Sequence, residues 1–350
     1  MIMEDSKKIL LCGYFAFGTN DNGGQPVKSR ELYFALCKRY GMENIRLLET
    51  KGWKRKPFKL IGNFYKQSLK SDYIIMMPAH NGLNVFSILL YLEKMFGRKK
   101  IYYNVIGGWL VEKVRRNCGL KKILSAFDGV WVETKSMADG LADEGFSNVK
   151  IVPNFKNLKV LSQKELVLEF KKPYPVCIFS RIVLEKGIED AIEAVTNINE
   201  KHGEVLVTLD LYGQIDNGYL ERFEMIRKKF PKYIRYCGMV EPNKSVETLK
   251  SYFALLFPTH YYTEGVPGTL IDACAAGVPV ITSLWKNHRD VFKQGVTGWG
   301  YEFEKRELLQ ELLERAIEKS NEFSEMRKSA LDEAHRYDPD SIINMIDGLL

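Results

Sequence analysis

The feature that most constrains the fold is a regular alternation of short apolar runs with helical patterns. Apolar runs at 7–15, 44–50, 71–80, 98–107, 127–134 and 149–154 predict buried strands, and helical patterns at 29–41, 84–97 and 136–146 stand between some of them. Apolar strands interleaved with helices are typical of a parallel sheet that is covered on both faces. We therefore expect an α/β fold.

The same rhythm restarts after the proline-bearing segment 171–175. Strands are expected at 176–180, 205–213, 234–240, 253–259 and 278–282, with helical patterns at 187–203, 219–231 and 243–252. We therefore predict two doubly wound, Rossmann-like domains that face each other across a cleft: residues 1–170, residues 171–335, and a C-terminal helix at 336–350 that crosses back to the first domain. Ligands of such sheets bind at the carboxyl ends of the strands.

Charge is divided unevenly along the 350 residues. Residues 1–170 contain 28 Lys or Arg against 16 Asp or Glu, whereas residues 171–350 contain 23 against 28. A first half with an excess of cations suggests that it faces something anionic. The six cysteines form no C-x-x-C pair, and no run of about 18 apolar residues is present. We expect no disulfide framework, no zinc site and no cleavable signal, and hence a cytoplasmic protein.

The stretch YYTEGVPGTLIDACAAGVPVIT, residues 261–282, places Glu264 before a Gly-Val-Pro-Gly turn and Asp272 about one turn into the helix that follows. Backbone N–H groups at a helix start, with the positive end of the helix dipole, are suited to a phosphate. The two acids could flank a bound diphosphate and accept hydrogen bonds from hydroxyl groups. Alternatively, Asp272 complements the helix dipole and Glu264 is a solvated loop acid.

A second polar stretch, FSRIVLEKG at 179–187, follows the first strand of the second half. It places Arg181 and Lys186 before a helix, where the dipole disfavours cations. Cations in that position indicate an anionic ligand, and an Arg with a Lys is a usual way to hold a diphosphate. The alternative is a solvated pair of loop cations with Glu185 beside them.

Three further features are weaker. Gly23 and Gly24 permit positive φ and close approach of a ligand, in a loop before a helix that opens near Ser29, although the pattern is not a dinucleotide fingerprint. His80, at the carboxyl end of a strand, is a candidate for the acceptor side or a structural histidine. The acids of YDPDS at 337–341 predict an N-cap role for Asp340, and we expect no metal in the chemistry.

The basic runs at 51–60 and 112–124 mix cations with aromatic and apolar residues. This combination favours contact with an anionic membrane surface. No helix-turn-helix, zinc or RNA-binding signature accompanies the charge, so nucleic acid is not the expected partner. A solvated surface is the remaining alternative.

Taken together, these motifs resemble the GT-B fold glycosyltransferases, and most of all glycosyltransferase family 4, whose members are retaining enzymes that use nucleotide sugars. The resemblance covers nearly the whole chain, through residues 22–41, 128–154, 180–187, 236–240 and 264–283. It implies that Arg181 and Lys186 bind the donor diphosphate and that Glu264 contacts the donor sugar. It also implies that Asp272 contacts the ribose, that Gly23 and Gly24 lie beside the donor, and that the diphosphate is held by the backbone of Val266, Pro267, Gly268, Thr269 and Leu270.

The sequence departs from the family pattern in two places. Asp272 stands where the family usually has Glu. Many relatives carry a His-Gly pair after a strand of the first domain, where this chain has Ile106 to Gly108. Whether His80 replaces that histidine is left open.

The expected function is therefore that of a metal-independent, retaining hexosyltransferase without a cofactor. It would move a sugar from a nucleoside-diphosphate donor, UDP-linked, to a glycan or lipid-linked acceptor in surface polysaccharide biosynthesis, in the cytoplasm or at the inner face of the membrane. The alternatives are a nucleotide-sugar epimerase of similar fold and a catalytically silent subunit that binds nucleotide or glycan.

Overall fold

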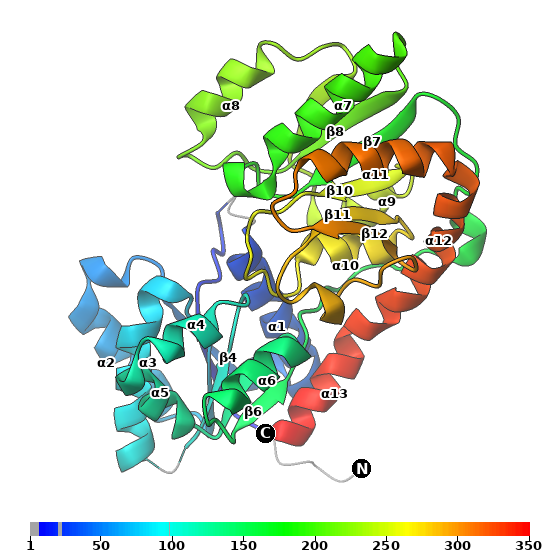
Figure 1. Cartoon of the computed structure of the whole chain (residues 1–350). Helices are drawn as coiled ribbons and strands as arrows, with labels where there is room; N and C mark the ends of the chain where they lie inside the picture. Colours follow the sequence, from blue (N-terminus) through cyan, green and yellow to red (C-terminus); the bar gives the residue numbers. More distant parts are fainter. Residues whose placement is uncertain (1–6, 20–22, 98) are drawn as a thin grey trace. The chain divides into compact units, whose positions relative to one another are not determined.

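The structure is a computed structural model and describes residues 7–19, 23–97 and 99–350. The chain divides into two compact units (Figure 1). Unit 1 comprises Met1–Asn157 and Tyr337–Leu350, and unit 2 comprises Leu158–Arg336. The domain boundary expected at 170–171 lies inside unit 2. Each unit is described by itself.

Unit 1 is built on a parallel sheet of six strands in the order β2-β1-β3-β4-β5-β6. The strands are β1 (Ile9–Gly13), β2 (Ile45–Glu49), β3 (Tyr73–Met76), β4 (Lys100–Asn104), β5 (Gly129–Val132) and β6 (Val149–Ile151). All five residues of β1 are buried, because helices cover both faces of the sheet. The expectation of a covered parallel sheet is confirmed here.

The helices of unit 1 pack against two separate apolar clusters. One cluster joins one face of the sheet to α2 (Pro57–Ser68), α3 (His80–Phe96), α4 (Leu110–Arg115), α5 (Cys118–Ser125) and α6 (Lys135–Asp143). The other joins the opposite face to α1 (Gly24–Tyr40) and to α13 (Pro339–Leu349), the last helix of the chain. A C-terminal helix was predicted at 336–350, and in the structure α13 belongs to unit 1.

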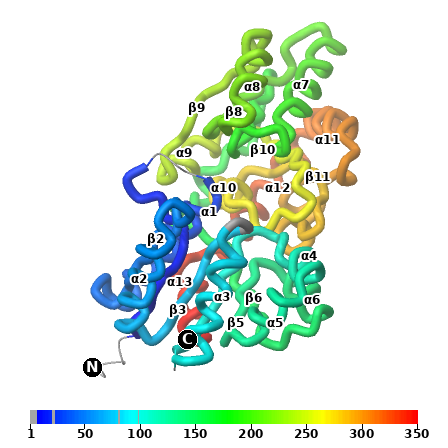
Figure 2. The backbone as a smooth tube through the Cα atoms, turned by 90° about the vertical axis from the view of Figure 1, so that its left-hand side faces the viewer, coloured from blue at the N-terminus to red at the C-terminus, as the bar shows by residue number. Residues whose placement is uncertain are grey.

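The segment α13 lies against α1, although the two are some 300 residues apart in sequence (Figure 2). Its apolar residues Ile342, Ile343 and Ile346 are buried in the cluster on that face. Near its end, the Asp347 carboxylate accepts hydrogen bonds from Lys7 Nζ at 2.6 Å, Arg39 Nη2 at 2.6 Å and Tyr40 Oη at 2.5 Å. These donors hold the pKa of Asp347 far below its usual range.

Two expectations about helix starts were wrong. Asp338 rather than Asp340 caps α13, accepting from the backbone N–H of Ser341 at 2.9 Å. The helix α1 begins at Gly24 rather than near Ser29, because Pro26 is tolerated in a first turn, where no N–H is needed. Gly23 is its N-cap with φ of −60°. Neither Gly23 nor Gly24 uses the left-handed backbone for which glycine had been singled out.

Unit 2 has its own parallel sheet of six strands, in the order β12-β11-β10-β7-β8-β9. The strands are β7 (Tyr174–Phe179), β8 (Val207–Tyr212), β9 (Ile234–Gly238), β10 (Ala254–Phe257), β11 (Val280–Leu284) and β12 (Gly298–Glu302). The helices are α7 (Ile188–His202), α8 (Leu220–Arg227), α9 (Ser245–Leu249), α10 (Gly268–Ala275), α11 (Glu307–Glu318) and α12 (Ser320–Glu333). Of these elements, β12, α11 and α12 were not expected from the sequence.

In the part of the chain that the structure describes, no helix combines the length and the apolar character needed to cross a membrane.

Candidate functional site

The direction of the strand order in unit 2 changes between β7 and β10. From β7 the chain moves to β8 and β9 on one side, and it returns to form β10 on the other side of β7. In open parallel sheets, the loops at such a switch point leave a crevice outside the carboxyl ends of the strands. The loops that follow β7 and β10 carry Arg181, Lys186 and Glu264, so the predicted residues lie where the topology places a ligand.

Close approach of these two loops requires a glycine. Lys186 ends a short 3-10 turn, Leu184–Lys186, and Gly187 follows with φ of +67°. A Cβ on Gly187 would lie 2.0 Å from the carbonyl oxygen of Pro258, the residue after β10. Any other residue would push the loops apart and would also strain the backbone. Gly187 thus brings Lys186 next to the loop that carries Glu264.

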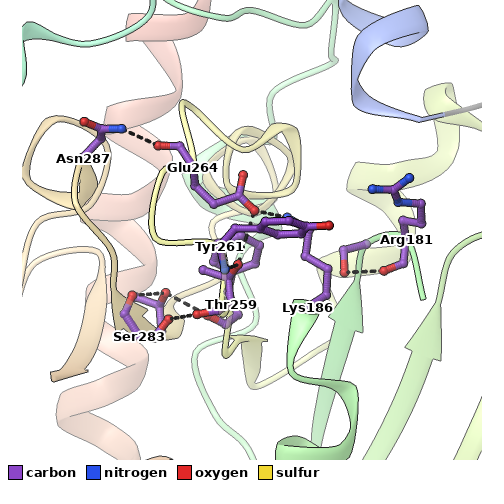
Figure 3. Close-up of polar contacts among 10 residues, drawn as sticks. Arg181, Lys186, Thr259, Tyr261, Glu264, Ser283 and Asn287 are labelled. Atoms are coloured by element: carbon purple, nitrogen blue, oxygen red, sulfur yellow. Dashed lines mark hydrogen bonds and ion pairs between the residues drawn. The ribbon is translucent and has the colours of Figure 1, made fainter. Parts of the chain in front are cut away.

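Lys186 and Glu264 form an ion pair in which the ammonium of Lys186 donates to the carboxylate of Glu264 (Figure 3). The side chains are 14% and 16% exposed, so the pair is largely shielded and still reaches the surface. The Lys186 ammonium also lies 5.0 Å from the centre of the Phe257 ring and 5.2 Å from that of Tyr261. Both distances are within the range of cation–π attraction.

Buried polar residues fix the loop that carries Glu264. Asn287, only 1% exposed, donates from Nδ2 to the carbonyl oxygen of Glu264 at 2.6 Å. Thr259 Oγ1 donates to the Glu264 carboxylate at 3.3 Å, and Ser283 Oγ donates to the Thr259 carbonyl at 2.6 Å. Figure 3 shows these side chains around Glu264. None of these three residues was predicted from the sequence, because each lies in a different segment and acts only through contacts made in the fold.

The hydroxyl of Tyr261 is a further polar group beside the pair. Burial, together with the nearby carboxylates of Glu185 and Glu264, raises the pKa of Tyr261 above its ordinary value. The phenol therefore stays neutral at pH 7 and can donate a hydrogen bond.

A histidine–aspartate contact braces the same two loops. His260 Nε2 lies 2.6 Å from a carboxylate oxygen of Asp190, in the first turn of α7. The backbone N–H of His260 donates to the Glu185 carbonyl at 2.7 Å. These bonds join the residue before Lys186 to the loop after β10, and they were also missed by the sequence analysis.

The helix α10 begins directly after Glu264 and its turn. Pro267 is the N-cap and supplies no side-chain cap, so the first N–H groups of the helix have no side-chain acceptor at that position. Val266 and Leu270 are buried and fix the turn on the core. The hydroxyl of Thr269 is shielded from solvent and has no hydrogen-bond partner among the described residues. This helix start has the features of an anion site.

Asp272, the second acid of the motif, is buried, with 2% of its surface exposed. Ser245 Oγ, at the start of α9, donates to its carboxylate at 2.8 Å. The structure therefore shows Asp272 joining α10 to α9. The contact with a ribose that the resemblance implies stays a prediction.

Arg181 is not part of the Lys186–Glu264 cluster. Its side chain is 48% exposed and its guanidinium donates to Asp216 at 3.3 Å. Figure 3 draws it apart from the ion pair. An exposed pair of this kind contributes at most about 1 kcal/mol to folding, so Arg181 is available to a ligand at little cost in stability.

In unit 1, Gly23 and Gly24 stand at the start of α1. His80 is the first residue of α3, and its side chain lies outside the part of the chain that the structure describes. The loop after β4 holds Ile106, whose carbonyl accepts from Trp109 Nε1 at 2.8 Å.

A polar pair that the sequence did not indicate lies at this edge of the sheet: buried Lys28 donates to Glu133 at 2.6 Å and to the Val105 carbonyl at 3.0 Å.

Residues 162–333 match the family model described as "Glycosyl transferases group 1". A comparison with curated proteins finds no match. Among solved structures, the chain is similar to Anabaena Alr3699/HepE in complex with UDP and glucose, with a TM-score of 0.72, 14% identity and 98% of each chain covered. It is also similar to sucrose-phosphate synthase from Thermosynechococcus elongatus, with a TM-score of 0.76, 14% identity and 98% of each chain covered.

These similarities confirm the fold class predicted from the sequence, two Rossmann-like domains of the GT-B type. The matched segment, 162–333, contains Arg181, Lys186, Glu264 and Asp272. The site described above therefore lies within the segment that this family model matches.

Proposed function

We propose that the protein is a retaining hexosyltransferase of glycosyltransferase family 4, which moves a sugar from a UDP-linked donor to a hydroxyl group of its acceptor. The observation that carries the proposal is the Lys186–Glu264 ion pair at the switch point of unit 2, directly before the uncapped start of α10. A cation and the N–H groups at a helix start match the diphosphate of such a donor, and a carboxylate matches its sugar hydroxyls.

In this proposal the donor diphosphate lies on the start of α10, against the backbone from Val266 to Leu270. Lys186 and Arg181 bind its oxygens, and their attraction strengthens as negative charge develops on the departing nucleotide. Because Lys186 is paired with Glu264 in the free protein, the arriving diphosphate would share or take over the ammonium. The Glu264 carboxylate would then accept hydrogen bonds from the sugar hydroxyls.

Support for UDP comes from a relative of the same fold. Anabaena HepE has been solved in complex with UDP and with UDP-glucose. Asp272 would accept from the ribose, with Ser245 orienting its carboxylate. Gly23 and Gly24 are also proposed to contact the donor. No metal or other cofactor is part of the proposal.

For the acceptor we propose a glycan or a lipid-linked glycan in the synthesis of a surface polysaccharide. The excess of cations in residues 1–170 supports an acceptor at an anionic surface. We place the protein in the cytoplasm, at the inner face of the membrane.

The test is a product assay with UDP-glucose, UDP-galactose and UDP-N-acetylglucosamine against a panel of glycan and lipid-linked acceptors, with EDTA present. The expected result is acceptor-dependent release of UDP and a product that keeps the anomeric configuration of the donor. Glu264→Gln should impair transfer while UDP still binds, because the amide keeps the shape and loses the charge. Unchanged turnover in that variant would mean that Glu264 is only a loop acid.

A silent nucleotide- or glycan-binding subunit is the second candidate. The observation that favours it is the absence of His-Gly at Ile106 to Gly108, after β4. UDP binding without turnover across the whole acceptor panel would support it. Conversion of the donor sugar without any acceptor would instead indicate an epimerase.

A further inference from the structure

The helix α3 of unit 1 exposes an apolar surface. Among its residues whose exposure is described, six are exposed, and five of them are apolar; the sixth is Asn84. The apolar five are Val85, Ile88, Leu92, Met95 and Phe96, with Phe96 87% exposed. Their spacing of three, four and three residues along 85–95 places them on one side of the helix.

The five exposed apolar residues, which form a stripe along α3, are not part of the hydrophobic core. The buried apolar residues of α3 are Leu83, Phe86 and Leu90, which pack against the sheet in one of the apolar clusters of unit 1. The exposed positions lie on the opposite side of the helix. A surface helix normally presents charged or polar residues on its outer side. The outer stripe of α3 therefore indicates something other than water as its neighbour.

The neighbouring helix α2 continues this apolar surface. Its exposed apolar residues, spaced three, four and four apart along one side, are Phe58, Ile61, Tyr65 and, directly after the helix, Leu69. Ser68 Oγ donates to Glu93 of α3 at 2.7 Å, which places the two helices next to each other (Figure 1). Ile61 and Tyr65 lie near Ser68 around α2, so the exposed stripe runs along the edge of α2 that is next to α3. We call these nine apolar residues of α2 and α3 the α2–α3 face.

Cations lie beside the α2 part of the α2–α3 face. Residues 51–70 contain seven Lys or Arg and no Asp or Glu. Lys59, Lys66 and Lys70 are exposed and lie on the side of α2 next to its apolar stripe. Apolar side chains beside lysines are the arrangement of helices that lie in the interface of an anionic bilayer.

We propose that the α2–α3 face docks unit 1 on an anionic lipid bilayer, with α2 and α3 lying along the membrane surface. The apolar stripes enter the boundary between headgroups and acyl chains, and the lysines contact lipid phosphates. This proposal goes beyond sugar transfer and does not depend on it.

Two other occupants fit the observations less well. A second copy paired through the same face would bring two identical belts of cations together, since a two-fold interface matches a patch with itself. Nucleic acid would use the lysines and leave the aliphatic stripe of α3 exposed to water. A bilayer satisfies both the charge and the apolar surface.

The test is flotation of the full chain with vesicles of phosphatidylcholine alone and with an equal mixture of phosphatidylcholine and phosphatidylglycerol, at low and high salt. The wild type should bind the mixed vesicles at low salt, release at high salt because the charges are screened, and ignore neutral vesicles. Lys59→Gln/Lys66→Gln/Lys70→Gln should weaken binding roughly 100-fold. Ile88→Ser/Leu92→Ser should weaken it by about tenfold or more, because both side chains leave the apolar boundary.

The matched control is Leu220→Ser/Met225→Ser, which removes two exposed apolar side chains from α8 of unit 2 and should leave binding unchanged. Thermal unfolding of all variants should match the wild type, since every changed side chain is exposed. The proposal is overturned if the wild type fails to bind mixed vesicles, or if the α3 variant binds as the wild type does. Sedimentation velocity provides a third result that would overturn the proposal. In that result the wild type is a dimer, the Ile88→Ser/Leu92→Ser variant is a monomer, and both bind vesicles equally. Failure of sugar transfer bears on none of these results.

Discussion

Replacing Lys186 separates its role in the fold from its role in the reaction. Lys186→Met keeps the apolar stem against Phe257 and Tyr261 and removes the charge. Among the described residues, Glu264, which is 16% exposed, then has no cation and keeps only the Thr259 hydroxyl as a side-chain donor, at 3.3 Å. Exposed ion pairs contribute up to about 1 kcal/mol, and breaking a fully buried pair costs roughly 3–5 kcal/mol. For this largely shielded pair we expect the free energy of unfolding to fall by about 2 kcal/mol.

The double variant Lys186→Met/Glu264→Gln removes the stranded charge as well. It should therefore regain about 1 kcal/mol or more of the lost stability, because the amide leaves no unpaired ion. Transfer should not return. Loss of one positioned donor to a developing negative charge lowers turnover roughly 100- to 1000-fold. Both variants should show that loss.

The assays are urea unfolding followed by circular dichroism, and UDP release with the best donor and acceptor pair. Stability and turnover should thus change independently across the three proteins. If Lys186→Met turned over within tenfold of the wild type, Lys186 would be a structural partner of Glu264 and no part of the diphosphate site. If the double variant regained transfer, the defect of the single variant would be one of folding.

Three further outcomes follow from other contacts. Arg181→Ala should weaken UDP binding about tenfold in calorimetry and leave thermal unfolding unchanged, because the exposed Asp216 pair adds little stability; equal UDP affinity would exclude Arg181 from the site. Asp272→Asn should weaken UDP binding about tenfold and leave the binding of inorganic pyrophosphate unchanged, because pyrophosphate has no ribose. Ser245→Ala, which removes the hydrogen bond to the Asp272 carboxylate, tests whether that bond is needed for UDP binding. Equal losses of affinity for UDP and pyrophosphate would contradict a ribose contact. Asp347→Asn should lower the unfolding temperature of unit 1 at neutral pH, because the lowered pKa of Asp347 means that its ionised carboxylate stabilises the fold above the unfolded pKa of about 4. The difference in unfolding temperature between variant and wild type should shrink as the pH falls below about 4. A difference that persisted in acid would refute a role for the charge.

The sheets could be predicted from the sequence because strands that are buried on both faces appear as continuous apolar runs. Strands such as β1 and β10 are apolar throughout, and they alternate with helices that bury one side. The elements that were not predicted have less regular patterns of apolar residues. In α2, the exposed Phe58 and Ile61 and the dense lysines hide the buried side, and in β12 two glycines interrupt a short strand.

The candidate site was only partly accessible from the sequence. Local motifs indicated Lys186 and Glu264, because each follows a strand and precedes a helix start. Their pairing depends on the contact of Gly187 with Pro258, which unites segments some 70 residues apart. The His260–Asp190 contact and the burial of Asp272 against Ser245 likewise exist only in the fold. No local pattern marks such partners.

The proposed function depends on the binding of a nucleoside diphosphate to unit 2 through Lys186 and the start of α10. Calorimetric titration of the full chain with UDP, GDP and ADP, in the presence of EDTA, tests it most directly, with Lys186→Met as the matched variant. We expect the wild type to bind UDP preferentially, and the variant to bind it roughly ten- to 100-fold more weakly because one charge-assisted contact is lost. Absence of binding by all three nucleotides, or equal UDP affinity in the two proteins, would contradict it.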